Sequence, residues 1–158
     1  MSTILGTHNS LTSYKLVWWQ RPFSWFINLC SRCQSKSIDE QLKDGVSYFN
    51  LQICYYKDEW YGSHGLAIYN VKFWDIFEKI KLSSSKERPI YFQLYLDKNF
   101  FVGQNIEKFN QLIKIIEREC LDCNVHIAIT WVENNGDFDV RKQFKVKDNY
   151  WGLWWIKD

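Results

Sequence analysis

Apolar residues recur along this chain in two spacings that alternate with one another. Runs of β-branched and aromatic residues bounded by turn residues predict strands, whereas apolar positions three and four residues apart, with charged residues between them, predict helices. The expected strands cover residues 3–5, 46–53, 60–65, 90–96, 125–132 and 141–158, and the expected helices cover 37–42, 71–82 and 106–120. This alternation is typical of a mostly parallel sheet with crossover helices.

Two of the three histidines directly follow predicted strands. His8 lies in a polar turn over residues 6–10, and His64 precedes Gly65 at the end of an extended segment. Loops at the carboxyl ends of parallel strands carry the chemistry of α/β folds, and an imidazole both accepts and donates protons near neutral pH. His8 and His64 are therefore candidate acid–base residues. His126 lies inside an apolar strand, and we interpret it as structural.

The length of 158 residues fits a single domain over residues 1–158. A complete eight-stranded α/β barrel needs about 250 residues, so the length excludes one. The sequence holds 9 Trp, 9 Tyr and 11 Phe, which supply large rigid side chains for a hydrophobic core. The chain is therefore expected to fold.

The charge distribution excludes some classes of partner. The chain has 20 Lys and Arg residues and 18 Asp and Glu residues, and the positive and negative residues are interspersed along it. A nucleic-acid partner is therefore not indicated. No basic and then apolar signal segment stands at the start, and no apolar run approaches the roughly 20 residues that span a bilayer. We expect a cytoplasmic protein that is peripheral to a membrane or associated with a virion.

The five cysteines leave two alternatives open. Cys30, Cys33, Cys120 and Cys123 form two C-x-x-C pairs, the unit of structural zinc sites. The other interpretation places both pairs at helix ends as small buried residues in a reducing compartment. The sequences that precede both pairs favour a continuing helix, and we expect no cofactor.

Five short segments resemble one known family. Segments 5–10, 33–34, 37–53, 64–65 and 86–92 read LGTHNS, CQ, SIDEQLKDGVSYFNLQI, HG and KERPIYF. Their order and spacing resemble the X region of phosphatidylinositol-specific phospholipase C, and the resemblance is strongest over residues 2–97.

The resemblance implies an α/β fold that is a partial, half-size TIM-barrel-like structure of mostly parallel strands with crossover helices. It also implies cleavage of a phosphodiester by paired histidines. His8 would be the general base that takes a proton from the inositol 2-hydroxyl, and His64 the general acid that protonates the departing glycerol oxygen.

The departures from the family pattern all concern charge. Ser47 stands where the family usually has an arginine, and Asn50 where it has an acidic residue. Gln52 stands where the bacterial type has a phosphate-binding arginine and the calcium-dependent type has an acidic ligand. Asn9 matches a calcium ligand, but Ca²⁺ prefers several carboxylate oxygens, so we expect no calcium site. The expected substrate-binding residues are Asn9, Asn50, Gln52 and the loop cation Lys15.

Two functions follow from this pattern. The first is a weak, metal-independent phosphodiesterase of lipid metabolism that acts on a phosphoinositide-like phosphodiester or a membrane-surface lipid, with an aromatic rim at 18–26 facing the bilayer. The second is a catalytically degenerate structural or binding module, for example a phage protein, that keeps only the scaffold. A half-barrel leaves sheet edges uncovered, so we expect a homodimer, another protein partner or the aromatic C-terminal segment to cover them.

Overall fold

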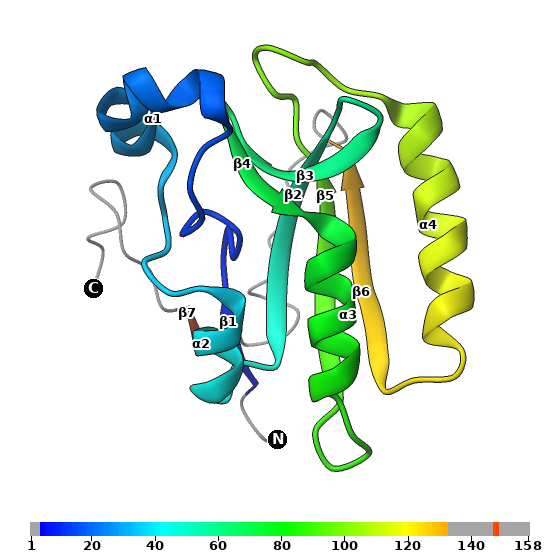
Figure 1. Ribbon diagram of the computed structural model, residues 1–158. Coiled ribbons are helices and arrows are strands. Elements are labelled where there is room, and N and C mark those ends of the chain that lie inside the picture. Colours follow the sequence, from blue (N-terminus) through cyan, green and yellow to red (C-terminus); the bar gives the residue numbers. More distant parts are fainter. Residues whose placement is uncertain (1–3, 133–146, 149–158) are drawn as a thin grey trace.

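The computed structural model describes residues 4–132 and 147–148 of the chain. Its elements are, in order, β1 (Leu5–Thr7), the 3₁₀ helix η1 (Trp18–Phe23), α1 (Ser24–Ser31), α2 (Ile38–Lys43), β2 (Tyr48–Tyr56), β3 (Glu59–His64), β4 (Ala67–Lys72), α3 (Phe73–Ser83), β5 (Ile90–Leu96), α4 (Ile106–Cys120), β6 (Val125–Val132) and β7 (Lys147–Asp148). All seven strands belong to one sheet (Figure 1).

Strand β2 is the centre of this sheet. It pairs in parallel with β1 at Tyr48 and Phe49 and with β5 over residues 48–53. Near its end it pairs antiparallel with β3 over residues 53–56. Strand β6 extends the sheet in parallel beyond β5, and β7 pairs in parallel with β1. Within the described residues β6 pairs only with β5 and β7 only with β1, so this part of the sheet is open.

The mixed strand directions partly confirm the expected architecture. The parallel order β1, β2, β5, β6 agrees with it, and residues 90–96, 106–120 and 125–132 form the predicted elements. The antiparallel strand β4 was not predicted, because its residues were divided between a loop and the following helix. The first strand, β1, lies two residues later than the predicted range of 3–5. The turn at 134–137 and most of the strand at 141–158 lie outside the described residues.

A two-residue turn reverses the chain between β2 and β3. Lys57 and Asp58 have φ angles of 48° and 59°, in the left-handed region. Consecutive left-handed residues suit the right-handed twist of a two-stranded hairpin. The hairpin carries the chain back along β2, so that His64 ends β3 at the level of the middle of β2.

Helices α3 and α4 cover one face of the sheet (Figure 1). Side chains alternate across a strand, so Phe49, Leu51 and Ile53 of β2 join the core under these helices while Asn50 and Gln52 face the other way. Phe77 of α3 is fully buried, and its ring meets the ring of Phe92 of β5 edge to face with centroids 6.1 Å apart. No helix of the described part is long and apolar enough to cross a membrane.

Helix α2 begins as its sequence predicts. The Ser37 hydroxyl accepts a hydrogen bond from the Glu40 backbone N–H, and the Glu40 carboxylate accepts one from the Ser37 N–H. This capping box satisfies two backbone donors at the helix start. Helix α2 thereby holds Gln41 against the loop after β1.

Replacing Phe77 by Ala tests the packing of α3 on the sheet. The substitution leaves a cavity beneath α3 and should lower the free energy of unfolding by about 3–5 kcal/mol. Leu82→Ala on the same helix is the control, because Leu82 is 86% exposed. Urea denaturation measures both variants, and equal transition midpoints would contradict the assigned packing.

Candidate active site at one end of the sheet

The loop after β1 is tied to the neighbouring elements by buried hydrogen bonds. The Thr7 hydroxyl lies 2.6 Å from Gln41 Oε1 of α2 and 2.8 Å from the Ser10 hydroxyl. Ser10 in turn bonds β2, because its Oγ accepts from Asn50 N–H and its N–H donates to the Asn50 carbonyl. The half-buried His8 is fixed through its carbonyl, which accepts from Gln34 Nε2 at 2.8 Å. The position of His8 is therefore set by α2, by β2 and by the segment between α1 and α2.

Asn9 brings the two histidine segments together. Its φ of 48° lies in the left-handed region, which Asn tolerates better than most residues. Its backbone N–H donates to Asn50 Oδ1 at 2.9 Å, and its side-chain Nδ2 lies 3.3 Å from His64 Nε2. His8 and His64 therefore lie at the same end of the sheet, with the Asn9 side chain against the second imidazole.

The hydrogen bonds of His64 define its neutral tautomer. Nδ1 lies 2.6 Å from the Ser31 carbonyl oxygen, which only accepts, so Nδ1 carries the hydrogen. In the neutral ring Nε2 then accepts from Asn9 Nδ2. Asn9 Oδ1 is buried and has no hydrogen-bond partner among the described residues. Protonation of Nε2 therefore requires the Asn9 amide to turn and present Oδ1.

Cys33 is a member of this cluster that the sequence did not mark as functional. Its buried Sγ lies 3.2 Å from Asn9 Nδ2 and 3.9 Å from His64 Nδ1. Thr12 Oγ1 accepts from the N–H groups of both Cys33 and Gln34 and so fixes the chain there. The sequence drew attention to Cys33 only through a C-x-x-C pair and through the Cys-Gln pair within the family resemblance, and neither signal pointed to a contact with His64.

The surroundings of His64 act on its pKa in opposite directions. Burial lowers the pKa, whereas the nearby Cys33 sulfur and the Ser31 carbonyl raise it, and the Asp97 charge raises it further. The net pKa lies above the ordinary value. The imidazolium form is thus favoured more in the folded chain than in the unfolded chain.

The remaining predicted binding residues are neutral and buried. Asn50 Nδ2 donates to Gln93 Oε1 of β5 at 2.7 Å, while Asn50 Oδ1 accepts from Asn9. Gln52 lies on the same face of β2 and is 8% exposed. This set offers amide groups and no carboxylate, so it does not fit Ca²⁺, which prefers several charged oxygens.

The structure does not bring together the four cysteines of the zinc alternative. Cys33 lies against His64, whereas Cys120 and Cys123 lie at the end of α4, where the Cys123 thiol donates to the Cys120 carbonyl. Across the described residues no group of three or more His, Cys, Asp and Glu side chains is arranged to hold a metal ion. The zinc alternative is therefore wrong for this part of the chain.

Two other predicted positions lie apart from the cluster. Lys15 is exposed, and the structure anchors it through its carbonyl, which accepts from the Asn70 N–H of β4. His126 of β6 is exposed and stacks on the ring of Tyr91 with centroids 5.2 Å apart, as a structural residue would.

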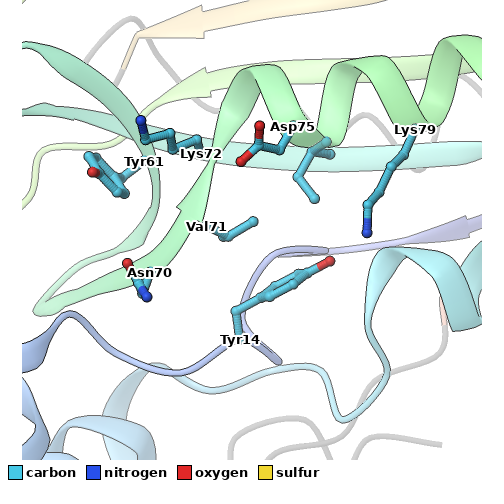
Figure 2. A pocket seen from close by; sticks show the side chains of 8 residues that line it. Tyr14, Tyr61, Asn70, Val71, Lys72, Asp75 and Lys79 are labelled. Carbon is cyan, nitrogen blue, oxygen red and sulfur yellow. The ribbon is translucent and has the colours of Figure 1, made fainter.

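A pocket of about 460 Å³ lies away from both histidines, between the loop after β1, the β3–β4 hairpin and α3. Figure 2 shows Tyr14 and Lys79 approaching each other at one end, and Tyr61 and Lys72 at the other. Lys79 pairs with Asp39 and Lys72 with Glu59, so both cations at its rim are already neutralised. The pocket includes none of the predicted site residues.

Comparison with known proteins supports the fold at low sequence identity. No protein-family model matches the chain, and no curated protein matches it. A solved structure of phosphatidylinositol-specific phospholipase C from S. aureus aligns with this chain with a TM-score of 0.52 and 16% identity. The alignment covers 75% of this chain and 39% of that enzyme, so the chain spans about two fifths of its length. The fold of this chain is therefore similar to part of a phospholipase C scaffold.

The raised pKa of His64 predicts how stability depends on pH. A group whose pKa is higher in the folded state stabilises the fold below its unfolded pKa, about 6.5 for His, and loses that effect as the pH rises through the folded value. Replacing His64 by Gln should therefore cost more unfolding free energy at pH 5.5 than at pH 8.5. Urea denaturation at both pH values measures this difference, with His126→Gln as the control. Equal costs at the two pH values would refute the assigned environment of His64.

Proposed function

We propose that the chain is a metal-independent phosphodiesterase of low turnover that acts on a phosphoinositide-like phosphodiester at a membrane surface. The observation that carries the proposal is the contact of Asn9 with His64 Nε2, which assembles the loop of His8 and the end of β3 into one cluster. The similarity to part of a phospholipase C fold supports the same substrate class.

The two imidazoles divide the proton transfers. His8 takes a proton from a hydroxyl next to the phosphodiester, and the resulting oxygen attacks phosphorus to form a cyclic phosphodiester. His64 gives its proton to the oxygen of the leaving alcohol as the phosphorus–oxygen bond breaks. A water molecule then attacks the cyclic phosphodiester. The neutral His64 takes a proton from this water, and the protonated His8 gives its proton to the ring oxygen as the phosphorus–oxygen bond of the ring breaks, which releases the phosphomonoester and resets both imidazoles.

Two features of the cluster limit the rate of this reaction. His64 acts as an acid only when Nε2 is protonated, and this state needs the Asn9 amide to turn. Within the described part of the cluster, the groups offered to the charge that develops on the phosphoryl oxygens are the neutral amides of Asn9, Asn50 and Gln52. Loss of one oriented donor costs on the order of 10²–10³ in rate, and loss of a full charge costs more. We therefore expect turnover well below that of an enzyme with a cation in this position.

An exposed apolar surface beside the cluster suits a lipid substrate. Trp18, Phe23 and Trp25 of η1 and α1 are 70%, 63% and 73% exposed. The Trp19 ring meets Phe101 of the β5–α4 loop edge to face at 5.0 Å, so two distant segments share this surface. In the same loop Phe100 N–H donates to the Gly65 carbonyl, next to His64. Trp and Phe side chains favour the membrane–water interface, where they would bring the cluster to its substrate.

A second function, ligand binding without turnover, is favoured by one specific observation. The Asn50 and Gln93 side chains satisfy each other at 2.7 Å, which is how neutral amides behave in a structural or binding module with no phosphate to hold. The chain would then be a degenerate relative that keeps the scaffold, with a second copy or another protein covering its open sheet edges.

Substitution of the histidines separates the two functions. In the presence of EDTA, the wild type should release inositol phosphate from phosphatidylinositol vesicles, and His8→Ala and His64→Ala should each lower the rate at least about 10²-fold. His126→Ala should match the wild type, because His126 lies apart from the cluster. Release at one background rate by all four proteins would rule out the phosphodiesterase and leave the binding module.

The exposed aromatic surface gives a separate prediction about membranes. Trp25→Ala should weaken sedimentation of the protein with phosphatidylinositol-containing vesicles by about three- to tenfold, because a large apolar side chain no longer enters the interface. Leu82→Ala removes an apolar side chain from α3 that is even more exposed, at 86%, and serves as the control. Equal losses of binding in both variants, or none in either, would contradict docking through η1 and α1.

A further inference from the structure

Asp97 is a buried carboxylate that the sequence did not mark and that the proposed proton transfers do not use. It follows the last residue of β5 and is 5% exposed. Burying a charged group is costly unless hydrogen bonds compensate, so its position needs a physical reason. Two of its hydrogen bonds supply that reason, because they lead to the turn that carries His64.

The Asp97 carboxylate bonds to the residues on both sides of His64. Its Oδ2 accepts from the Ser63 hydroxyl at 2.6 Å and from the Gly65 backbone N–H at 2.8 Å. Gly65 has a φ of 61°, in the left-handed region, so the turn bends sharply at this point. A single oxygen thus holds the side chain of the residue before His64 and the backbone of the residue after it.

The neighbours of Asp97 reinforce the same turn. Asn99 Nδ2 donates to the Ser63 hydroxyl and to the Ala67 carbonyl, each at 3.1 Å. Phe100 N–H donates to the Gly65 carbonyl at 3.0 Å. The β3–β4 turn is therefore held from one side by the segment that follows β5, and among these hydrogen bonds Asp97 supplies the charged group.

Building on the proposed function, we propose that Asp97 is the positioning residue of His64, which holds the imidazole against Asn9 and Ser31. Its negative charge is also one of the influences that raise the pKa of His64. The carboxylate acts through the turn and does not touch the substrate. Three other groups contact the imidazole or the Ser31 carbonyl that it bonds, and they also influence the position and protonation of His64. They are the Cys33 thiol, the Asn9 amide and the Tyr69 hydroxyl, which donates to the Ser31 carbonyl.

Asp97→Asn tests the proposal, because it preserves the shape of the side chain and removes its charge. The ring nitrogens of His64 are followed by ¹⁵N NMR from pH 5 to pH 9 in the intact protein. The midpoint of the His64 titration should move to lower pH, while that of His126 stays in place. Asp122→Asn, at the exposed C-terminal end of α4, makes the same substitution at the opposite end of the sheet and should move neither midpoint.

Ser63→Ala is the second variant, and it removes one of the two bonds while leaving the carboxylate in the protein. It should weaken the bond of His64 Nδ1–H to Ser31, so that the two ring-nitrogen signals of the neutral imidazole move toward each other. It also keeps the test decisive if Asp97→Asn fails to fold. The proposal is overturned if Asp97→Asn lowers the melting temperature but leaves the His64 midpoint unchanged, and Ser63→Ala leaves the ring-nitrogen signals unchanged. Asp97 would then be a structural residue.

Kinetics provide an additional readout. Displacement of His64 in Asp97→Asn should lower kcat up to about 10²-fold, with KM changed less than about twofold. The NMR titration needs no turnover, so a wild type without activity would end the proposed phosphodiesterase function while leaving the positioning role of Asp97 to be decided by the titration.

Discussion

The structure depends on the number of neighbours that one strand can have. Strand β2 has β5 along one edge, and on the other edge β1 near its start and β3 near its end. This division leaves a short stretch of β2 between β1 and β3, around Asn50. Backbone groups there bond to the loop after β1 instead of to a strand, as the two bonds between Ser10 and Asn50 show. The site forms where the ladder on this edge of β2 is interrupted.

The polar side chains of the site are neutral and satisfy one another. Like charges gathered in a buried site repel one another unless counter-charges or a metal offset them, whereas amides and hydroxyls can pair with each other. Asn9, Asn50 and Gln93 form such a series of hydrogen bonds from the loop after β1 through β2 to β5. The hydrogen bonds of this series occupy amide groups that would otherwise be free to bind a phosphate. Stabilising the fold and binding a phosphate would therefore require the same side chains.

The sequence predicted the long elements well because their patterns are local. Strand β5 and helix α4 follow from an apolar run and a helical spacing, and α2 from its capping residues. Strand β4 was not predicted, because its position depends on pairing with β3, and the order of apolar residues does not encode that pairing. His8 and His64 were singled out as candidates from strand ends and family resemblance. Cys33 and Asp97 were not, because their roles arise only when α1 and β5 meet the β3–β4 turn in space.

The bond between Phe100 N–H and the Gly65 carbonyl has a spatial consequence. One end of it belongs to a loop whose Phe100 ring is 76% exposed, and the other end lies one residue from His64. The exposed aromatic loop and the turn of His64 are therefore hydrogen-bonded to each other directly, and any surface that the Phe100 ring touches lies next to the turn that carries the imidazole.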